Sequence, residues 1–426
     1  MAAEFMLTGD TTSTLLPHFS SAASLSFIQL PSAHSFRIFV LHIPFSQIHG
    51  ARFTDMNKGD LALVNSLTTP ILPNFHHGVD MSAITREQAT QATAQLKSEL
   101  AKVIVGQSEV IEQTLVAFAA GGHALLEGVP GLAKTLLIST LASATRLSFN
   151  RIQFTPDLMP ADITGTEVIR EDKATGARDL AFLPGPIFAS VILADEINRT
   201  PPKTQAAMLE AMQERQVSAG GQRRPLPTPF FVLATQNPIE QEGTYILPEA
   251  QLDRFLLKIV VGYPSEADEL EVIRRTTGTA AGKVQAVLEG ETLIGLQQLV
   301  RETPVADGII RYALALVRAT RPVKEGGHPE ISSLLQWGAG PRAGQSLILC
   351  AKARATLYGR AFVSLDDIKA LAKPVLRHRL RASYEAEAQG MSTDTIIEKM
   401  LALVKLPASE LEKDPMVAQA LTATSA

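Results

Sequence analysis

The chain has 426 residues, of which 46% are hydrophobic and 19% charged, a composition typical of a globular protein with room for two domains. A formal net charge of −4 argues against tight binding along a nucleic-acid backbone, which needs clustered Lys and Arg. The single cysteine, Cys350, excludes an internal disulfide and a cysteine-based zinc site. The composition therefore favours a reducing compartment, and we expect a cytoplasmic protein.

Residues 1–80 differ in composition from the rest, because they hold six of the nine His but only three Lys or Arg. Their apolar stretch at 24–48 is interrupted by Pro, His and Arg, falls short of a membrane helix, and lacks a preceding basic region. We therefore expect no membrane span, and we expect 1–80 to be a poorly ordered extension. Translation that begins at Met81 and an ordinary variable extension both remain open as explanations.

Residues 81–264 show the pattern of an α/β domain. A well-patterned helix is expected over 85–105, and from His123 onward short β-rich runs alternate with helical patterns. Such alternation is typical of a mostly parallel sheet covered by helices. Five strands are expected, at 123–127, 149–154, 190–194, 229–235 and 256–261.

A phosphate-binding loop is predicted at 128–135, since this segment follows an apolar strand and opens a helix expected over 136–144. The loop N–H groups would surround phosphates, Lys134 would neutralise their charge, and the Thr135 hydroxyl would bind Mg²⁺. A chance Gly-Pro-Gly turn is the alternative. The residues predicted to bind ATP here are Gly128, Val129, Pro130, Gly131, Leu132, Ala133, Lys134 and Thr135.

Ala133 stands where the usual phosphate-loop motif has glycine. Because this residue starts the helix, we expect it to have a negative φ, at which a methyl group is tolerated.

Two carboxylates end the apolar strand run at 190–196, and ligands of parallel sheets bind just beyond the strand C-termini. Asp195 suits the Mg²⁺ shell, usually through water, together with Thr135. Glu196 lies one residue further and can orient and deprotonate the attacking water. The alternative is that both acids cap the next helix, expected over 203–215, but two prolines stand nearer to its start.

After Pro264 the strand signal disappears and the periodicity becomes helical, which predicts a helical lid domain over 265–390. A tail over 391–426 carries one more amphipathic run at 396–404. His378 lies between two arginines near a helix end. The simplest interpretation is a basic cluster favoured by the helix dipole, and the alternative is a contact with a phosphate or with another subunit. The apolar stripe that exemplifies the helical period is Ile310, Ala313, Leu314 and Val317.

Eight short motifs lie between residues 104 and 380, each of them once. They lie at 105–107 (VGQ), 128–135, 157–165, 183–188, 195–199 (DEINR), 234–238 (ATQNP), 247–255 and 340–342 (GPR). As a set they resemble the MoxR family of AAA+ ATPases, which also carries Ala before the phosphate-loop Lys. The resemblance implies an α/β AAA+ core with a five-stranded parallel sheet, followed by an all-α lid domain.

The same resemblance implies roles for residues outside the loop. Gly106 and Gln107 would line the adenine pocket, and Asn237 would position the lytic water with Glu196, which suits an amide that can donate and accept at once. Arg254 would be an arginine finger acting on the ATP of a neighbouring subunit, so that a ring, a homo-hexamer, is implied. A surface ion pair with Asp253 or Glu249 is the alternative for Arg254.

Arg342 would report the nucleotide state from the lid, unless Pro341 and Arg342 merely form a turn. Two further segments, 165–183 and 217–229, are expected to be β-hairpins and candidates for client contact, with solvated loops as the alternative.

The resemblance also implies a function. The chain would hydrolyse Mg²⁺-bound ATP and use the energy to remodel or mature an unknown client protein. A partner that carries a von Willebrand factor A domain would act with it. Two alternatives are kept. A nucleic-acid motor is disfavoured by the acidic balance, although Arg223 and Arg224 on the second hairpin keep it open. A nucleotide-gated scaffold without turnover is disfavoured because Glu196, Asn237 and Arg254 are all present.

Overall fold

The computed structural model describes residues 84–129, 131–171, 178–238, 243–278 and 283–405, together with the backbone of three strands nearer the N-terminus. The chain divides into two compact units, Met1–Asp80 and Met81–Ala426. The first unit holds an antiparallel sheet in the order β1-β3-β2, formed by β1 (Ala2–Thr8), β2 (Ser24–Ile28) and β3 (Ile38–Pro44). Other residues up to 83 lie outside the described part, so the poor order expected for 1–80 stays a prediction.

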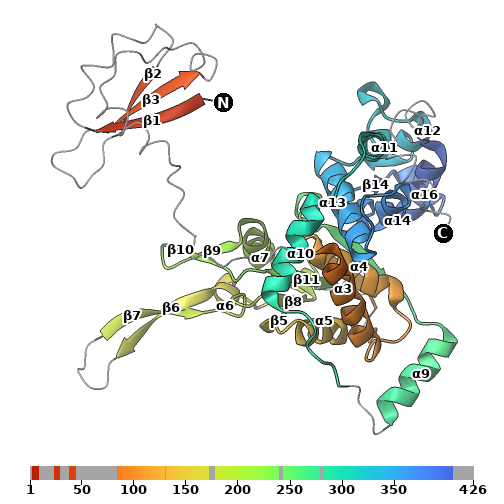
Figure 1. Ribbon diagram of the computed structural model, residues 1–426, viewed down its shortest axis with the longest axis horizontal. Helices are drawn as coiled ribbons and strands as arrows, with labels where there is room; N and C mark the ends of the chain where they lie inside the picture. Colours follow the sequence, from red (N-terminus) through yellow and green to blue (C-terminus); the bar gives the residue numbers. More distant parts are fainter. Residues whose placement is uncertain are drawn as a thin grey trace. The chain divides into compact units, whose positions relative to one another are not determined.

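A parallel five-stranded sheet forms the centre of the second unit, in the order β12-β4-β11-β8-β5 (Figure 1). All five predicted strands are confirmed, each within two residues of its predicted bounds. Because the strands run in parallel, the C-terminal ends of β4, β8 and β11 lie at one edge of the sheet. The strands are β4 (Ala124–Gly128), β5 (Phe149–Gln153), β8 (Val191–Asp195), β11 (Phe231–Gln236) and β12 (Leu257–Val261).

Helices cover both faces of this sheet, and alternate strand residues belong to different hydrophobic clusters. Leu126 and Leu193 pack with α3, α4 and α5, whereas Leu125 and Ile192 pack with α7. The predicted helix at 85–105 is confirmed, with Thr85 and Gln88 forming a capping box, but it ends at Ala101. The helices are α3 (Arg86–Ala101), α4 (Ser108–Ala119), α5 (Lys134–Ala144) and α7 (Pro202–Glu214).

Two hairpins extend from this domain, as predicted. The first consists of β6 (Gly165–Glu171) and β7 (Arg178–Pro184), which follow the short helix α6 (Pro160–Thr164); its tip at 172–177 lies outside the described residues. The second consists of β9 (Gln216–Ala219) and β10 (Gln222–Pro225). Its two turn glycines both have positive φ, which matches the two-residue turns that suit the strand twist.

The lid region is helical, as predicted, but it also contains a short ribbon of β13 (Leu335–Trp337) and β14 (Arg381–Ala382) that the periodicity did not reveal. The predicted amphipathic run at 396–404 lies largely in α16, whose Ile396, Ile397 and Met400 join the hydrophobic cluster that the lid shares with the α/β domain. The lid helices are α9 (Glu266–Thr277), α10 (Gly290–Glu302), α11 (Asp307–Ala319), α12 (Pro329–Ser332), α13 (Pro341–Leu357), α14 (Leu365–Leu376), α15 (Tyr384–Ala388) and α16 (Thr393–Leu403).

The predicted apolar stripe of α11 is only half right. Ile310 and Leu314 are 42% and 50% exposed, whereas Ile309 and Leu316 are buried. The helix carries apolar side chains on two adjacent faces, so the sequence period fits either face, and packing selects the one that includes the buried Tyr312.

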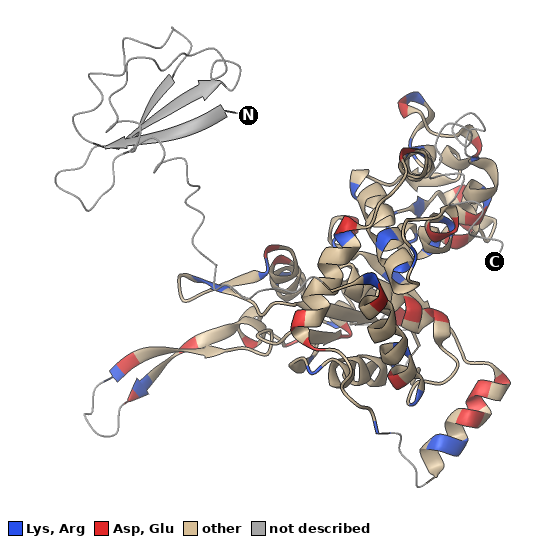
Figure 2. Cartoon of the chain, viewed as in Figure 1, with Lys and Arg blue, Asp and Glu red and all other residues tan. Residues whose placement is uncertain are grey.

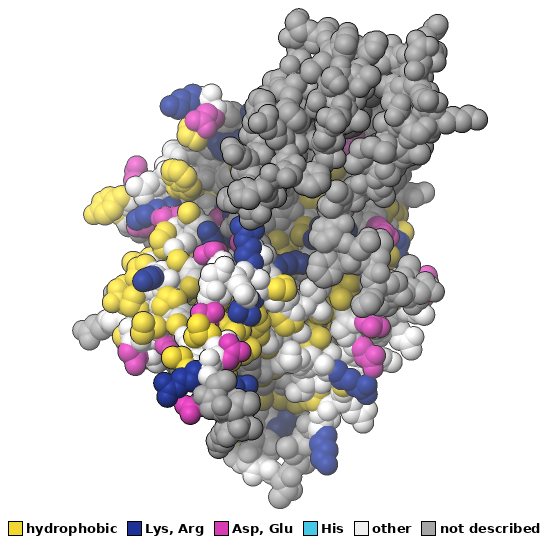
Figure 3. Space-filling model, turned by 90° about the vertical axis from the view of Figure 1, so that its left-hand side faces the viewer, with side chains coloured by type: hydrophobic (Ala, Val, Ile, Leu, Met, Phe, Trp, Pro, Cys, Tyr) yellow, Lys and Arg dark blue, Asp and Glu magenta, His cyan; other side chains and the backbone are white. Residues whose placement is uncertain are grey.

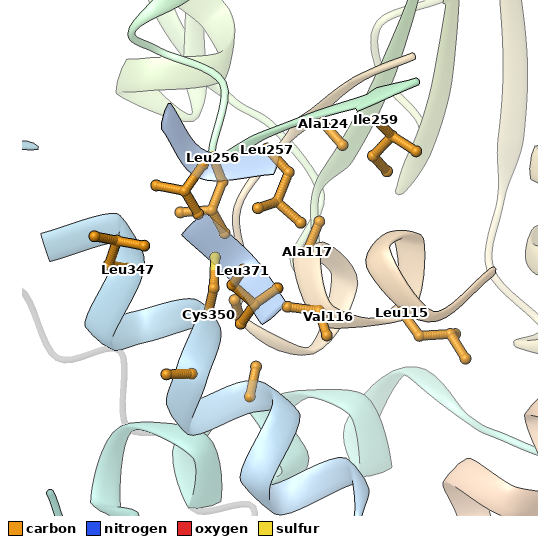
Figure 4. Close-up of a cluster of buried hydrophobic side chains, with 14 of the residues drawn as sticks. Leu115, Val116, Ala117, Ala124, Leu256, Leu257, Ile259, Leu347, Cys350 and Leu371 are labelled. Atoms are coloured by element: carbon orange, nitrogen blue, oxygen red, sulfur yellow. The ribbon is translucent and has the colours of Figure 1, made fainter. Parts of the chain in front are cut away.

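The lid packs on the edge strand of the sheet through a continuous hydrophobic core (Figure 4). Leu347 and Cys350 of α13 and Leu371 of α14 lie near Leu256 and Leu257 at the start of β12. The start of β12 is therefore held by the lid as well as by the sheet. Among the described residues, no helix is both long and apolar enough to cross a membrane.

Candidate active site

The loop between β4 and α5 offers hydrogen-bond donors to an anion. Ala133, the residue before α5, makes no side-chain cap, so it leaves the first N–H groups of this helix available to an anion. Gly131 has φ +85°, and a Cβ placed on it would meet no atom within 4 Å. Lys134 donates to the Gly128 carbonyl at 2.7 Å and Thr135 is exposed, while Pro130 lies outside the described residues. These features fit a bound phosphate.

Ala133 has φ +55° and ψ +22°, so the negative φ expected for it is wrong. The residue is the N-cap of α5 and still belongs to the loop, which reverses the chain direction through left-handed conformations at both Gly131 and Ala133. An alanine in this conformation costs about 1 kcal/mol. The loop thus holds a strained residue directly before Lys134.

The two carboxylates at the end of β8 share a contact to the neighbouring strand β11. The Thr235 hydroxyl donates to Asp195 Oδ1 at 2.7 Å and accepts the Glu196 backbone N–H at 2.8 Å. Glu196 itself has φ +58°, a strained conformation of the kind found at functional sites. One buried hydroxyl therefore fixes both acids relative to the strand that leads to Asn237.

Sequence reasoning assigned no role to three residues of this site. Arg151 donates to Asp195 Oδ2 through Nε at 3.0 Å and Nη2 at 2.6 Å, while Gln153 donates to Glu196 Oε2 at 2.9 Å. Arg199 also binds Glu196 Oε2, at 3.1 Å. Arg151 and Gln153 stand two apart on β5 and so share one face of the sheet, which is the only signal that could have found them.

The donor set also fits Mg²⁺. A carboxylate offers about four lone-pair sites, and Thr235 and Arg151 use three of those on Asp195. One site stays available for a water of the metal shell, on the same edge of the sheet as the Thr135 hydroxyl.

Asn237 directly follows β11 at this edge and is buried, with 4% of its surface exposed. In the sheet, Gln236 pairs with Glu127 of β4. Asn237 is therefore adjacent in register to the loop that begins at Gly128. The structure thus brings together the loop, the acid pair and Asn237, as the sequence predicts.

Arg254 and Arg342 lie at the opposite edge of the sheet. Leu257, the first residue of β12, pairs with Ala124, whereas Val261 pairs with Gly128. Four residues of strand, about 13 Å, therefore separate the level of Leu257 from the phosphate loop. Arg254 precedes β12 and lines a hollow of about 270 Å³ together with Arg342. Neither guanidinium can reach the phosphate loop of its own chain.

The ion pair weighed as the alternative for Arg254 is not formed. Asp253 binds Arg379 at 2.7 Å and Arg342 at 3.6 Å, and Glu249 binds Arg381 at 2.9 Å. Arg254 has no ion pair with any residue that the structure describes, and it also lines a second hollow of about 470 Å³ beside α7.

Gln107 lies near the loop, because its Nε2 approaches the Leu132 carbonyl at 3.5 Å. Gly106 has φ +72°, and a Cβ there would collide with the Asp268 carboxylate of α9. This close approach explains the glycine, and the adenine contact stays a prediction.

The basic residues at 377–379 are not a solvated cluster at a helix end. His378 and Arg379 are buried and bind the chain segment just before β12. Both side chains bond the Phe255 carbonyl, a partner far away in sequence that no local pattern reveals.

Comparison with known proteins agrees with this arrangement. A family model described as "ATPase family associated with various cellular activities (AAA)" matches residues 123–257, and an AAA lid domain model matches 330–400. Chaperone MoxR1 of Mycobacterium tuberculosis is 45% identical over 309 residues, which cover 72% of this chain and 81% of the relative. The uncharacterized protein YeaC of Bacillus subtilis is 42% identical, over 72% of this chain and 92% of the relative.

A solved structure of a Cytophaga hutchinsonii protein has a TM-score of 0.70 at 43% identity, and covers 76% of this chain and 97% of its own. Loop, acid pair, helical lid and relatives all agree, and the chain belongs to the MoxR family of AAA+ ATPases.

Proposed function

We propose that this chain hydrolyses ATP in a ring, a homo-hexamer, in which each active site is built by two neighbouring subunits. One observation carries the proposal. The phosphate loop, Glu196 and Asn237 occupy one edge of the sheet, whereas Arg254 and Arg342 occupy the other. A second copy that presents its Arg254 edge to the loop edge of the first would complete the site.

Within such a site, the N–H groups of the α5 N-terminus and Lys134 would bind the phosphates. Thr135 and Asp195 would hold Mg²⁺, which supplies positive charge to the phosphate oxygens. Gln153 and Arg199 both bind Oε2 of Glu196, which leaves Oε1 to accept a proton from water. Asn237 would orient that water, and Arg254 of the next subunit would stabilise charge on the transferred phosphoryl group.

We propose that the energy of this hydrolysis drives the remodelling or maturation of a client protein in the cytoplasm. A partner that carries a von Willebrand factor A domain would act together with the ring. The relative in Mycobacterium tuberculosis is named a chaperone. The first hairpin offers an apolar contact, because Ile169 and Leu180 face each other in register and are 70% and 66% exposed. Figure 3 views this side of the molecule, where hydrophobic side chains lie among charged ones.

A nucleic-acid motor is less well supported. Arg224 lies over the Phe182 ring of the first hairpin at 3.8 Å, and Arg223 lines a hollow that also holds Glu210 and Glu214. Lys and Arg are interspersed with Asp and Glu over the described chain (Figure 2). The arginines that kept this alternative open therefore have partners or opposite charges within the chain itself.

The shared site can be tested by mixing two inactive variants. Lys134→Ala subunits should fail to bind ATP, and Arg254→Ala subunits should bind ATP but hydrolyse it about 10³- to 10⁵-fold more slowly. After subunit exchange, an intact Lys134 from one chain meets an intact Arg254 from another, so the mixture should recover part of the parental rate of phosphate release. If fluorescence transfer shows that subunits have exchanged but no ATPase activity is recovered, the proposal is contradicted. If the parental ring forms but does not hydrolyse ATP, the nucleotide-gated scaffold is favoured.

A further inference from the structure

Arg379 sits where the lid meets the turn that carries Arg254. It follows α14, its side chain is 3% exposed, and it lines the hollow shared by Arg254 and Arg342. A buried arginine is costly unless its donors are bonded, and here they all are.

The partners of Arg379 lie on both sides of Arg254. Nη2 donates to the carbonyl of Asp253 at 3.3 Å and to that of Phe255 at 2.7 Å, and Nη1 donates to the carbonyl of Leu256 at 3.2 Å. Nε donates to the Asp253 carboxylate at 2.7 Å. Residues 253, 255 and 256 are thus all bonded to one planar group. The side chain of Arg254, between them, lines the hollow.

This turn depends on outside donors for a physical reason. Residues 253–256 come between α8 (Glu249–Leu252) and β12, so neither helix nor sheet bonds satisfy all their carbonyl groups. His378 adds a second contact to the Phe255 carbonyl at 3.1 Å. Since Phe255 is fully buried, its carbonyl has no access to replacement by bulk water.

The lid supplies every one of these donors. Arg379 also bonds Ser346 at 3.2 Å, and Ser346 lies one helical turn after Arg342 on α13. Arg342 reaches Asp253 as well, at 3.6 Å. The Asp253 carboxylate is therefore held between two arginines of the lid, one residue away from Arg254.

We propose that Arg379 is a positioning residue that shapes the 253–256 turn and so aims Arg254 at the ATP of the neighbouring subunit. The position of the finger is then set by the lid, not by the sheet alone. This inference rests on the proposed trans action of Arg254. It extends that proposal by naming the group that couples the lid to the finger.

The variant Arg379→Lys tests whether Arg379 positions Arg254, because an ammonium keeps the charge but cannot bridge carbonyls on both sides of Arg254. A displacement of about 1 Å can lower a rate ~10²-fold, so kcat should fall about 10- to 100-fold. The Kd for ATP should stay near the parental value, because the phosphate loop is at the other edge of the sheet. Arg381→Ala is the matched control, since its exposed pair with Glu249 also joins the lid to this region, and it should keep the parental kcat.

The decisive readout is complementation in mixed rings. Arg379→Lys should recover activity with Lys134→Ala, which supplies a well-placed finger, and should not recover with Arg254→Ala, because then neither chain supplies one. Recovery with neither partner would show a merely structural role, and recovery with Arg254→Ala would show that Arg379 acts on the ATP of its own chain; either result overturns the inference.

If Arg379→Lys does not fold, Asp253→Asn tests the same bond from the partly exposed side, and the same complementation pattern is required of it. Parental turnover in either variant would overturn the inference. If the control mixture of Lys134→Ala with Arg254→Ala stays inactive, the proposed trans action fails first and this inference fails with it.

Discussion

Among single residues, Thr235 joins the two acids of the site. Its hydroxyl is buried between Asp195 and the Glu196 N–H, so Thr235→Val keeps the shape but leaves a buried donor without an acceptor. We expect a loss of about 1–3 kcal/mol in the free energy of unfolding and a higher Mg²⁺ concentration at half-maximal ATPase rate, because Asp195 is no longer held.

Urea unfolding and Mg²⁺ titration of the ATPase rate measure the two effects. Thr140→Val is a matched control, since the Thr140 hydroxyl bonds only the preceding turn of its own helix, and it should leave the Mg²⁺ requirement unchanged. An unchanged Mg²⁺ requirement in Thr235→Val would show that Asp195 is positioned without this bond.

Among the elements, the junction between the phosphate loop and α5 depends on the left-handed conformation of Ala133. Ala133→Gly removes about 1 kcal/mol of strain but frees the unfolded chain by about as much, so stability should change by less than ~1 kcal/mol. Ala133→Val places a β-branched side chain at positive φ, and should lose about 1–3 kcal/mol along with most of the ATP affinity. Calorimetric titration with ATP and thermal unfolding check both; parental ATP affinity in the Val variant would show that the loop functions in another conformation.

For the whole molecule, buried histidines make stability depend on pH. His123 connects β4, β11 and α7, because Nδ1 accepts the Val232 N–H at 3.0 Å and Nε2 bonds the Met212 carbonyl at 3.1 Å. Burial lowers the pKa of His123 from 6.5 to about 4. Burial, and the nearby Arg379, also lower the pKa of His378.

Below pH 6.5 these histidines therefore bind protons in the unfolded chain but stay neutral in the folded chain. Stability should fall by about 3 kcal/mol from His123 alone as the pH drops from about 7.5 to 4, and should become independent of these groups above about pH 7.5. Urea unfolding at pH 7.5, 6 and 5 measures the slope. His123→Gln should be less stable at pH 7.5 but show a shallower decline; equal slopes would place the acid sensitivity elsewhere.

The sequence by itself determined the features that rest on local pattern. The five strands, the phosphate loop before α5, the acid pair at the end of β8 and Asn237 after β11 follow from runs of apolar residues and what comes directly after them. Because the strands are parallel, placing their ends also places the loop, Glu196 and Asn237 at one edge.

The tertiary structure alone decided what depends on contacts between distant segments. The bonds from Arg151 and Gln153 to the acid pair, and from Arg379 to the turn around Arg254, join residues more than 40 positions apart in the chain. The buried face of α11 and the positive φ of Ala133 likewise depend on packing and chain direction. Apolar periodicity reports which side chains avoid water, but not which polar groups meet, because a hydrogen bond needs a particular direction and distance that only the folded backbone supplies.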